Sequence, residues 1–72
     1  MKALYKTLLQ RGILGEANYE ECILLQVNTS HILAEREGKE EAKKHYESYG
    51  WRFYGTFFLT EVNRLEEGFI VL

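Results

Sequence analysis

A helix-forming pattern followed directly by a strand-forming one, within residues 38–62, constrains the fold of this chain more than any other feature. Glycines bound the first pattern at positions 38 and 50, and the charges between them are ordered. Acids come first and bases last: Glu40, Glu41, Lys43, Lys44 and His45. This order complements the helix dipole, and a glycine commonly follows the last helical residue. The pattern predicts a helix over residues 39–49.

Residues 51–62 alternate as a β-strand requires, with aromatic and β-branched side chains throughout. One parity holds Trp51, Phe53, Phe57 and Leu59, and the other holds Arg52, Tyr54, Thr56, Phe58 and Thr60. Because successive side chains of a strand point to opposite faces, we expect the first set to pack against the helix. The helix should bury Ala42, Tyr46 and Tyr49 there and expose Glu40, Lys43, Lys44 and Glu47.

The remaining segments are less distinct. Residues 22–27 and 31–36 are strand-like and flank Asn28-Thr29, which predicts a hairpin; one long bent strand is the alternative. Glu66-Glu67-Gly68 indicates a turn before a short strand over 69–72. In the N-terminal segment, the spacing of Leu4, Tyr5, Leu8 and Leu9 favours a helix that ends before Gly12, with a strand through Tyr5 to Leu9 as the alternative.

These elements predict an α+β fold in a single domain over residues 1–72. We expect two layers, with three or four mostly antiparallel strands and the 39–49 helix packed on one face. A chain of this size buries only about 60% of its surface. Cys22 is the only cysteine, so no disulfide within the chain can add stability. We therefore expect a cytoplasmic location and self-association, most simply as a homodimer.

The charge pattern bears on possible partners. The net charge is −2, which disfavours nucleic-acid binding by the chain as a whole. Residues 1–12 nevertheless carry Lys2, Lys6 and Arg11 without an acid, so this basic segment remains a candidate contact for nucleic acid. No apolar run is long enough to cross a membrane.

The sequence contains little evidence for a catalytic or metal site. Cys22 and His31 would form a nucleophile and base only if their segments paired, and no third group is fixed to orient them. Cys22 lies in an apolar run and is expected to be buried and inert. His31, His45 and Cys22 are too scattered for structural zinc. We expect no metal, no cofactor and no catalytic residue.

The aromatic strand is the unusual feature. Arg52, Tyr54 and Phe58 share one parity, and such a face suits a protein interface, a platform that stacks bases, or an internal core. We favour a non-enzymatic protein–protein interaction module, either a homodimer or a regulatory or accessory subunit of a larger complex. The alternative is a single-stranded RNA- or DNA-binding module using Lys2, Lys6, Arg11, Arg52, Tyr54 and Phe58. A small enzyme using Cys22 and His31 is a distant third.

Overall fold

The computed structural model describes residues 1–63 and 66–70. Residues 71 and 72 of the predicted C-terminal strand lie outside this range. In chain order the elements are β1 (Lys2–Arg11), β2 (Glu20–Asn28), α1 (His31–His45), the 3₁₀ helix η1 (Glu47–Tyr49), β3 (Arg52–Val62) and β4 (Gly68–Phe69).

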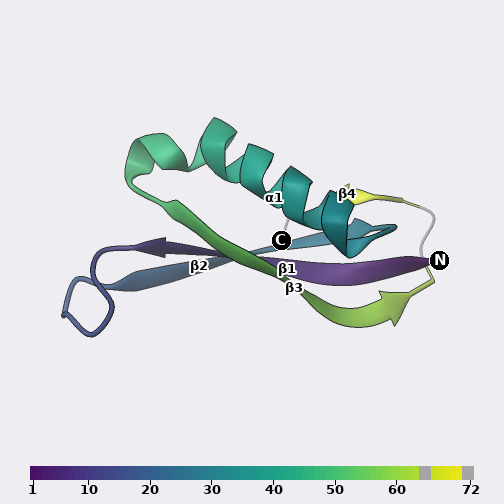
Figure 1. Ribbon diagram of the computed structural model, residues 1–72, viewed down its shortest axis with the longest axis horizontal. Coiled ribbons are helices and arrows are strands. Elements are labelled where there is room, and N and C mark those ends of the chain that lie inside the picture. The colour runs from purple at the N-terminus through teal and green to yellow at the C-terminus, as the bar shows by residue number, and fades with distance from the viewer. Residues whose placement is uncertain (64–65, 71–72) are drawn as a thin grey trace.

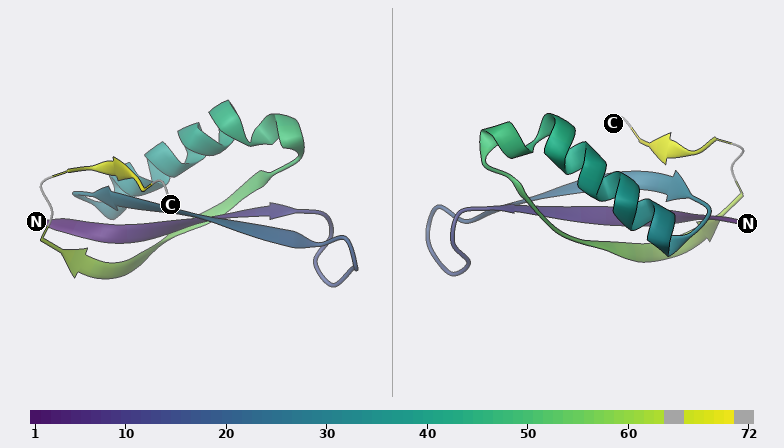
Figure 2. Two further views of the ribbon diagram at one scale, coloured as in Figure 1. Left: turned by 180° about the vertical axis from the view of Figure 1, so that it is seen from behind. Right: turned by 45° about the horizontal axis from the view of Figure 1, so that its top comes forward.

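The four strands form one sheet in the order β3-β1-β2-β4, with every neighbouring pair antiparallel. α1 lies across one face of this sheet, and neither Figure 1 nor the view from behind in Figure 2 shows a helix of the described residues on the second face. Because β1 lies between β2 and β3, these two strands run parallel, and β2-α1-β3 forms a split β-α-β unit. The predicted two-layer α+β fold is confirmed.

β1 is the central strand, so the favoured N-terminal helix is wrong and the alternative strand is right. Burial alternates strictly along it: Ala3, Tyr5, Thr7 and Leu9 are buried, whereas the residues between them are partly exposed. The spacing of the leucines and Tyr5 fits either a helix or a strand. Pairing with β2 on one side and β3 on the other decides for the strand, as tertiary context commonly overrides a weak local preference.

α1 begins at His31, so the predicted strand over 31–36, the hairpin turn at Asn28-Thr29 and the alternative long bent strand are all wrong. Ser30 caps the helix: its hydroxyl accepts a hydrogen bond from the backbone N–H of Leu33 at 3.2 Å. Serine is among the preferred residues at this position because its oxygen satisfies an otherwise unpaired N–H. The helix prediction holds for residues 39–45, and η1 follows.

The predicted helix face is only partly right. Ala42 is buried and Tyr46 partly so, but Tyr49 is 71% exposed because it lies in η1 rather than in a continued α-helix. The predicted exposed positions are confirmed: Glu40, Lys43, Lys44 and Glu47. Gly50 follows η1 with φ +91°, a backbone conformation that suits glycine.

α1 rests on the sheet through a stripe of small residues, Ala34, Gly38 and Ala42. At Gly38 the helix backbone approaches the sheet so closely that an added Cβ would lie 2.5 Å from Thr7 Oγ1 and 3.0 Å from Thr56 Oγ1. The two threonine hydroxyls are hydrogen-bonded to each other at 2.8 Å. This contact fixes the distance between the two layers.

A buried polar network joins β2 to the first half of α1. The Gln26 amide donates to the Ala34 carbonyl at 2.8 Å. Asn28 Nδ2 donates to Gln26 Oε1 at 3.2 Å and to a Glu37 carboxylate oxygen at 2.7 Å. Within residues 1–63 and 66–70, no buried side-chain polar atom lacks a partner, so the network offers no spare group for chemistry.

Candidate functional site

β3 does not keep the simple alternation that its sequence suggests. Its register against β1 shifts between Leu4 and Tyr5 and again between Leu8 and Leu9, and each shift leaves one extra residue on β3. These are β-bulges, and an extra residue moves the following side chains to the other face. The prediction that Phe53 and Phe57 share the helix face is therefore wrong.

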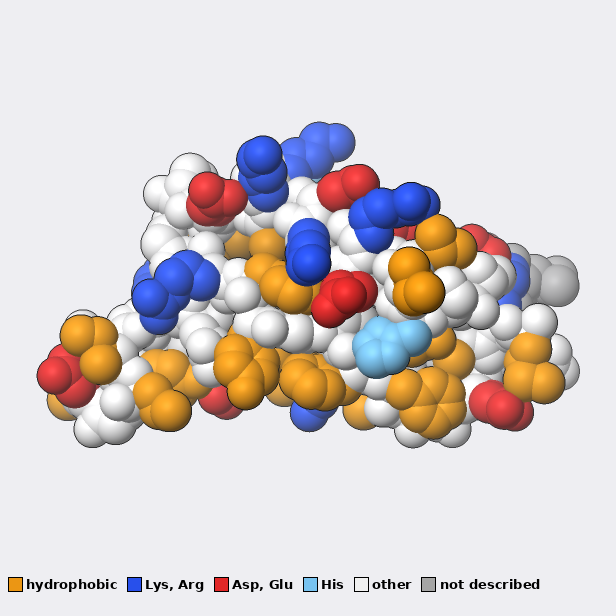
Figure 3. All heavy atoms as spheres, viewed as in Figure 1, with side chains coloured by type: hydrophobic (Ala, Val, Ile, Leu, Met, Phe, Trp, Pro, Cys, Tyr) orange, Lys and Arg blue, Asp and Glu red, His pale blue; other side chains and the backbone are white. Residues whose placement is uncertain are grey.

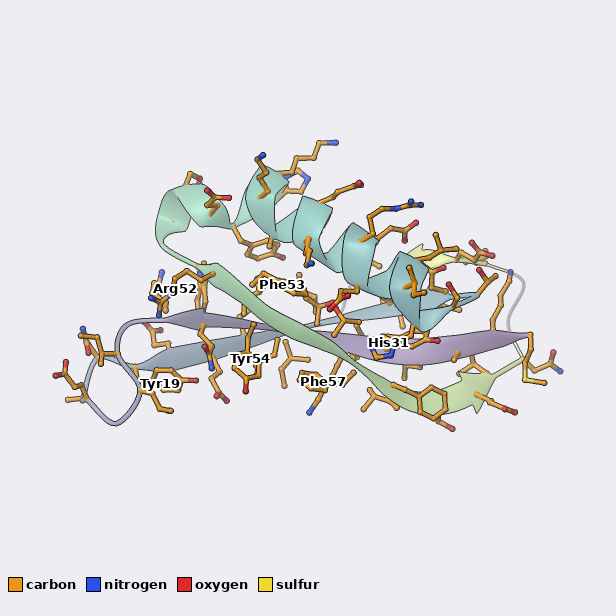
Figure 4. All side chains as sticks on the ribbon, viewed as in Figure 1. Tyr19, His31, Arg52, Phe53, Tyr54 and Phe57 are labelled. Atoms are coloured by element: carbon orange, nitrogen blue, oxygen red, sulfur yellow. The ribbon has the colours of Figure 1, made fainter. Side chains whose placement is uncertain are left out.

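Instead, Phe53, Thr56 and Phe58 pair with β1 residues that face α1. The Lys39 ammonium lies 5.6 Å from the centre of the Phe53 ring, which confirms the position of Phe53 beneath α1. Tyr54 and Phe57 lie on the opposite side of the sheet, where their rings stack at 6.3 Å (Figure 4).

The bulges thus separate Phe58 from the other two residues predicted to form one interface. Arg52 donates a hydrogen bond to the Gly12 carbonyl at 2.7 Å, and Tyr54 lies on the side away from α1. Phe58 packs edge-on against Tyr5, with ring centres 6.0 Å apart. Arg52 pairs with Gln10, on the side of the sheet where Tyr54 also lies, whereas Phe58 lies on the α1 side; the three residues therefore do not share one face.

The uncovered side, which we call the open face, carries mainly apolar and aromatic side chains from three strands and from Tyr19. Its members are Leu4, Lys6, Leu8, Tyr19, Ile23, Leu25, Tyr54 and Phe57. At one end of it, the Gln10 amide donates to the Tyr19 hydroxyl at 2.8 Å, and that hydroxyl donates to a Glu21 carboxylate oxygen at 2.6 Å. Near the centre, the Lys6 ammonium lies 5.7 Å from the centre of the Phe57 ring.

The sequence alone did not place Tyr19, Ile23 and Phe57 on this face. A glycine inside a strand often marks a bulge, so Gly55 was the one available signal that the alternation breaks. The position of a bulge depends on the partner strand, however, and β1 was not recognised as that partner.

The residues of the nucleic-acid alternative do not form one surface. Lys2 lies 3.7 Å from a Glu67 carboxylate oxygen. Arg11 forms an ion pair with Glu20 at 2.8 Å and lies 4.4 Å from the centre of the Trp51 ring. These cations are engaged locally and do not follow a single track that a phosphate backbone would need.

Cys22 and His31 do not meet. Cys22 is the partner of Leu9 on β1, whereas the His31 ring stacks on Tyr5 at 5.5 Å. Four residues along β1 correspond to about 13 Å. Cys22 is also partly exposed rather than buried. Among the residues the structure describes, no cluster of three or more His, Cys, Asp or Glu side chains is arranged to hold a metal ion.

Tyr46 lies beside Cys22 and Glu41 in a groove between β2 and α1. Burial raises the pKa of Tyr46 above its ordinary value of 10.0, and the neighbouring Cys22 and Glu41 raise it further. A hydrogen bond to Glu21 is the largest cause that raises the pKa of Tyr19.

In a spectrophotometric titration of the folded protein, we expect these two tyrosines to ionise at a higher pH than an ordinary tyrosine. Because the unfolded chain loses these protons at lower pH, the free energy of unfolding should fall as the pH rises above 10.0. Tyr46→Phe and Tyr19→Phe should each remove part of the tyrosinate absorbance that appears above the ordinary tyrosine pKa. If all tyrosines of the folded protein titrate at the ordinary pKa, the structure around both residues is contradicted.

None of the helices within residues 1–63 and 66–70 has the length and apolar character that crossing a membrane requires. Comparison with protein-family models, with curated proteins and with solved structures found no match to this chain. The function is therefore argued from the geometry of the open face.

Proposed function

We propose that this chain is a non-enzymatic protein-interaction module that forms a homodimer through the open face of its sheet. One observation carries the proposal: the open face presents large apolar side chains that α1 does not cover. Ile23 is 53% exposed, Tyr54 60% and Phe57 39%. Contiguous apolar patches on small domains commonly mark interaction surfaces.

The molecule has more surface than its size requires. Its accessible surface is 5217 Å², whereas a compact monomer of this size exposes about 4,700 Å². Its radius of gyration is 12.7 Å, against about 11 Å for a compact chain of this length. A sheet covered on one side produces this excess, and a second copy on the open face would bury it.

The dimensions of the open face support a weak, specific dimer. Strands of 9–11 residues extend about 30–36 Å, and three of them span about 14 Å. Two such faces in contact would bury at most about 1,000 Å² in total, near the lower limit for a specific interface, since Val27 beside Leu4 is already buried in the single chain. We therefore expect a dissociation constant in the micromolar range.

One two-fold arrangement would make the charges of the two open faces complementary. If the axis passes through Leu8 with the two β1 strands antiparallel, Lys6 of one copy faces Gln10 of the other. Glu21 is the partner of Gln10 on β2, so the Lys6 ammonium approaches the Glu21 carboxylate of the second copy. Two complementary pairs of this kind would fix the register of the dimer.

The outer edge of β3 is the competing surface, and two features disfavour it. The bulges interrupt its regular backbone spacing, and His31 Nε2 lies 2.6 Å from the Thr56 carbonyl oxygen. Bulges and shielded edges are common means by which proteins prevent edge-to-edge pairing. These features favour contact between faces over contact between edges.

Sedimentation velocity over a micromolar to millimolar concentration range tests the proposal. The protein should pass from monomer to dimer, and Tyr54→Ser should weaken the dimer by about tenfold or more. Because Tyr54 is largely exposed in the single chain, this variant should keep its circular dichroism spectrum. The matched control is Tyr49→Ser, an exposed tyrosine in η1, which should not alter dimerisation.

A charge exchange tests the axis. Lys6→Glu and Glu21→Lys should each weaken the dimer, and the double variant should restore most of the affinity. A chain that stays monomeric throughout would refute the homodimer. A monomer that instead binds single-stranded RNA through Tyr54 would favour the nucleic-acid alternative.

A further inference from the structure

A second surface, separate from the open face, has the features of a small-molecule site. It is a cleft of about 340 Å³ between the second half of α1 and the start of β3. Lys39, Lys43 and Arg52 surround it, and Trp51 and Phe53 form its apolar part. Figure 3 shows basic side chains beside a hydrophobic patch between α1 and the sheet, and Figure 4 labels Arg52 and Phe53 at the start of β3, below the C-terminal part of α1.

The cations of this cleft are not neutralised by the protein. Within the described part of the chain, no carboxylate lies within 4.0 Å of Lys39, Lys43 or Arg52. Among the residues that the structure describes, Glu47 is the one acid that lines the cleft, so this lining carries an excess of positive charge on a chain whose net charge is −2.

This arrangement has an energetic cost in the absence of a ligand. Lys39 and Lys43 are four residues apart on one helix, where like charges repel each other. An anion placed between them and Arg52 would relieve the repulsion. All three cations line the cleft, and the Arg52 guanidinium has N–H groups besides the one that it donates to the Gly12 carbonyl. Charged donors of this kind suit the oxygens of a phosphate group.

The aromatic residues indicate the rest of the ligand. Trp51 is partly exposed, and the Arg11 guanidinium already lies 4.4 Å from the centre of its ring. The Lys39 ammonium lies 5.6 Å from the centre of the Phe53 ring. A planar ring beside Trp51 or Phe53 would gain stacking and apolar contact while its phosphate met the three cations.

We propose that the cleft binds a planar ring that carries a phosphate, the chemistry of a nucleoside monophosphate. Its volume lies at the lower end of the range for small-molecule sites, which suits one nucleotide rather than a longer ligand. The same chemistry occurs at the phosphorylated 5′ end of a single strand. The cleft lies on the α1 side of the sheet, so the proposal does not depend on dimerisation through the open face.

Trp51 is the only tryptophan of the chain, so its fluorescence reports binding in the cleft directly. The full chain is titrated with adenosine monophosphate, with adenosine and with inorganic phosphate. We expect a saturable change with the monophosphate and at least about fivefold weaker responses to the other two, because each supplies only part of the contact. Added salt should weaken the response. A 5′-phosphorylated oligonucleotide that binds tighter than its 5′-hydroxyl form would identify a strand end as the source.

The variant Lys39→Gln should weaken the response to adenosine monophosphate by about tenfold, because it removes a charged hydrogen-bond donor. The matched control is Lys44→Gln, an exposed lysine of the same helix that does not line the cleft; its affinity should stay within about twofold. If both variants lose affinity for adenosine monophosphate equally, the binding depends on the overall charge of the helix rather than on the cleft, and the proposal is wrong. The absence of a saturable change with every probe would also overturn it.

Discussion

Replacing Gly38 with valine should unfold the domain or detach α1 from the sheet, and Gly38→Ala should lower the free energy of unfolding by about 1–3 kcal/mol. On an exposed helix surface the alanine would instead stabilise by about 1 kcal/mol. At position 38 the alanine destabilises instead, because its Cβ would lie 2.5 Å from Thr7 Oγ1 and 3.1 Å from Thr7 Cγ2. Thr7 is fully buried, so rotating its branched side chain only exchanges one clash for another.

Urea denaturation measures this effect, and a second substitution makes it specific. Thr7→Ala removes two of the three nearest atoms that the new methyl group would meet and leaves Thr56 Oγ1 at 3.0 Å, so it should restore part of the stability of Gly38→Ala although it also removes the hydrogen bond to Thr56. The control for helix propensity is Glu40→Ala at an exposed position of α1. A stabilising effect of Gly38→Ala would show that α1 does not lie this close to the sheet.

Leu9→Ala should be the most damaging truncation, with an expected loss of about 2–5 kcal/mol in the free energy of unfolding. Leu9 is 0% exposed and lies on the side of β1 that faces α1. A domain of this length has a total stability of only about 4–11 kcal/mol, so the variant should be close to its unfolding transition at room temperature.

The neighbouring residue provides the matched control, because Leu8 differs from Leu9 in its face and burial alone. Leu8 is only partly buried and lies on the open face, so Leu8→Ala should cost clearly less when both variants are compared below the concentration at which dimers form. Equal losses would mean that β1 does not present opposite faces to α1 and to solvent.

The sequence predicted that an aromatic surface exists beyond the core, but it did not predict correctly which residues form that surface. The aromatic density of residues 51–62 indicated a surface beyond the core, and Tyr54 was placed on the side away from α1. Phe58 was placed there too, and Phe57 was placed beneath the helix; the bulges of β3 reverse both assignments. The cleft beside Trp51 was not predicted, because it combines α1 residues with the start of β3 across a layer boundary.

The sequence alone determined the features that depend on neighbours along the chain. The basic residues 43–45 mark the end of α1 and Gly50 marks the end of η1. Dense aromatic and β-branched residues define the following strand, so an α+β fold follows from local preference. Only the tertiary structure decided the features that depend on distant partners. β1 is a strand because β2 and β3 pair with it on both sides. Position 38 in the middle of α1 requires glycine because Thr7 and Thr56 leave no room for a side chain. The faces of β3 are set by bulges against β1, since one extra residue in a period of two reverses every side chain beyond it.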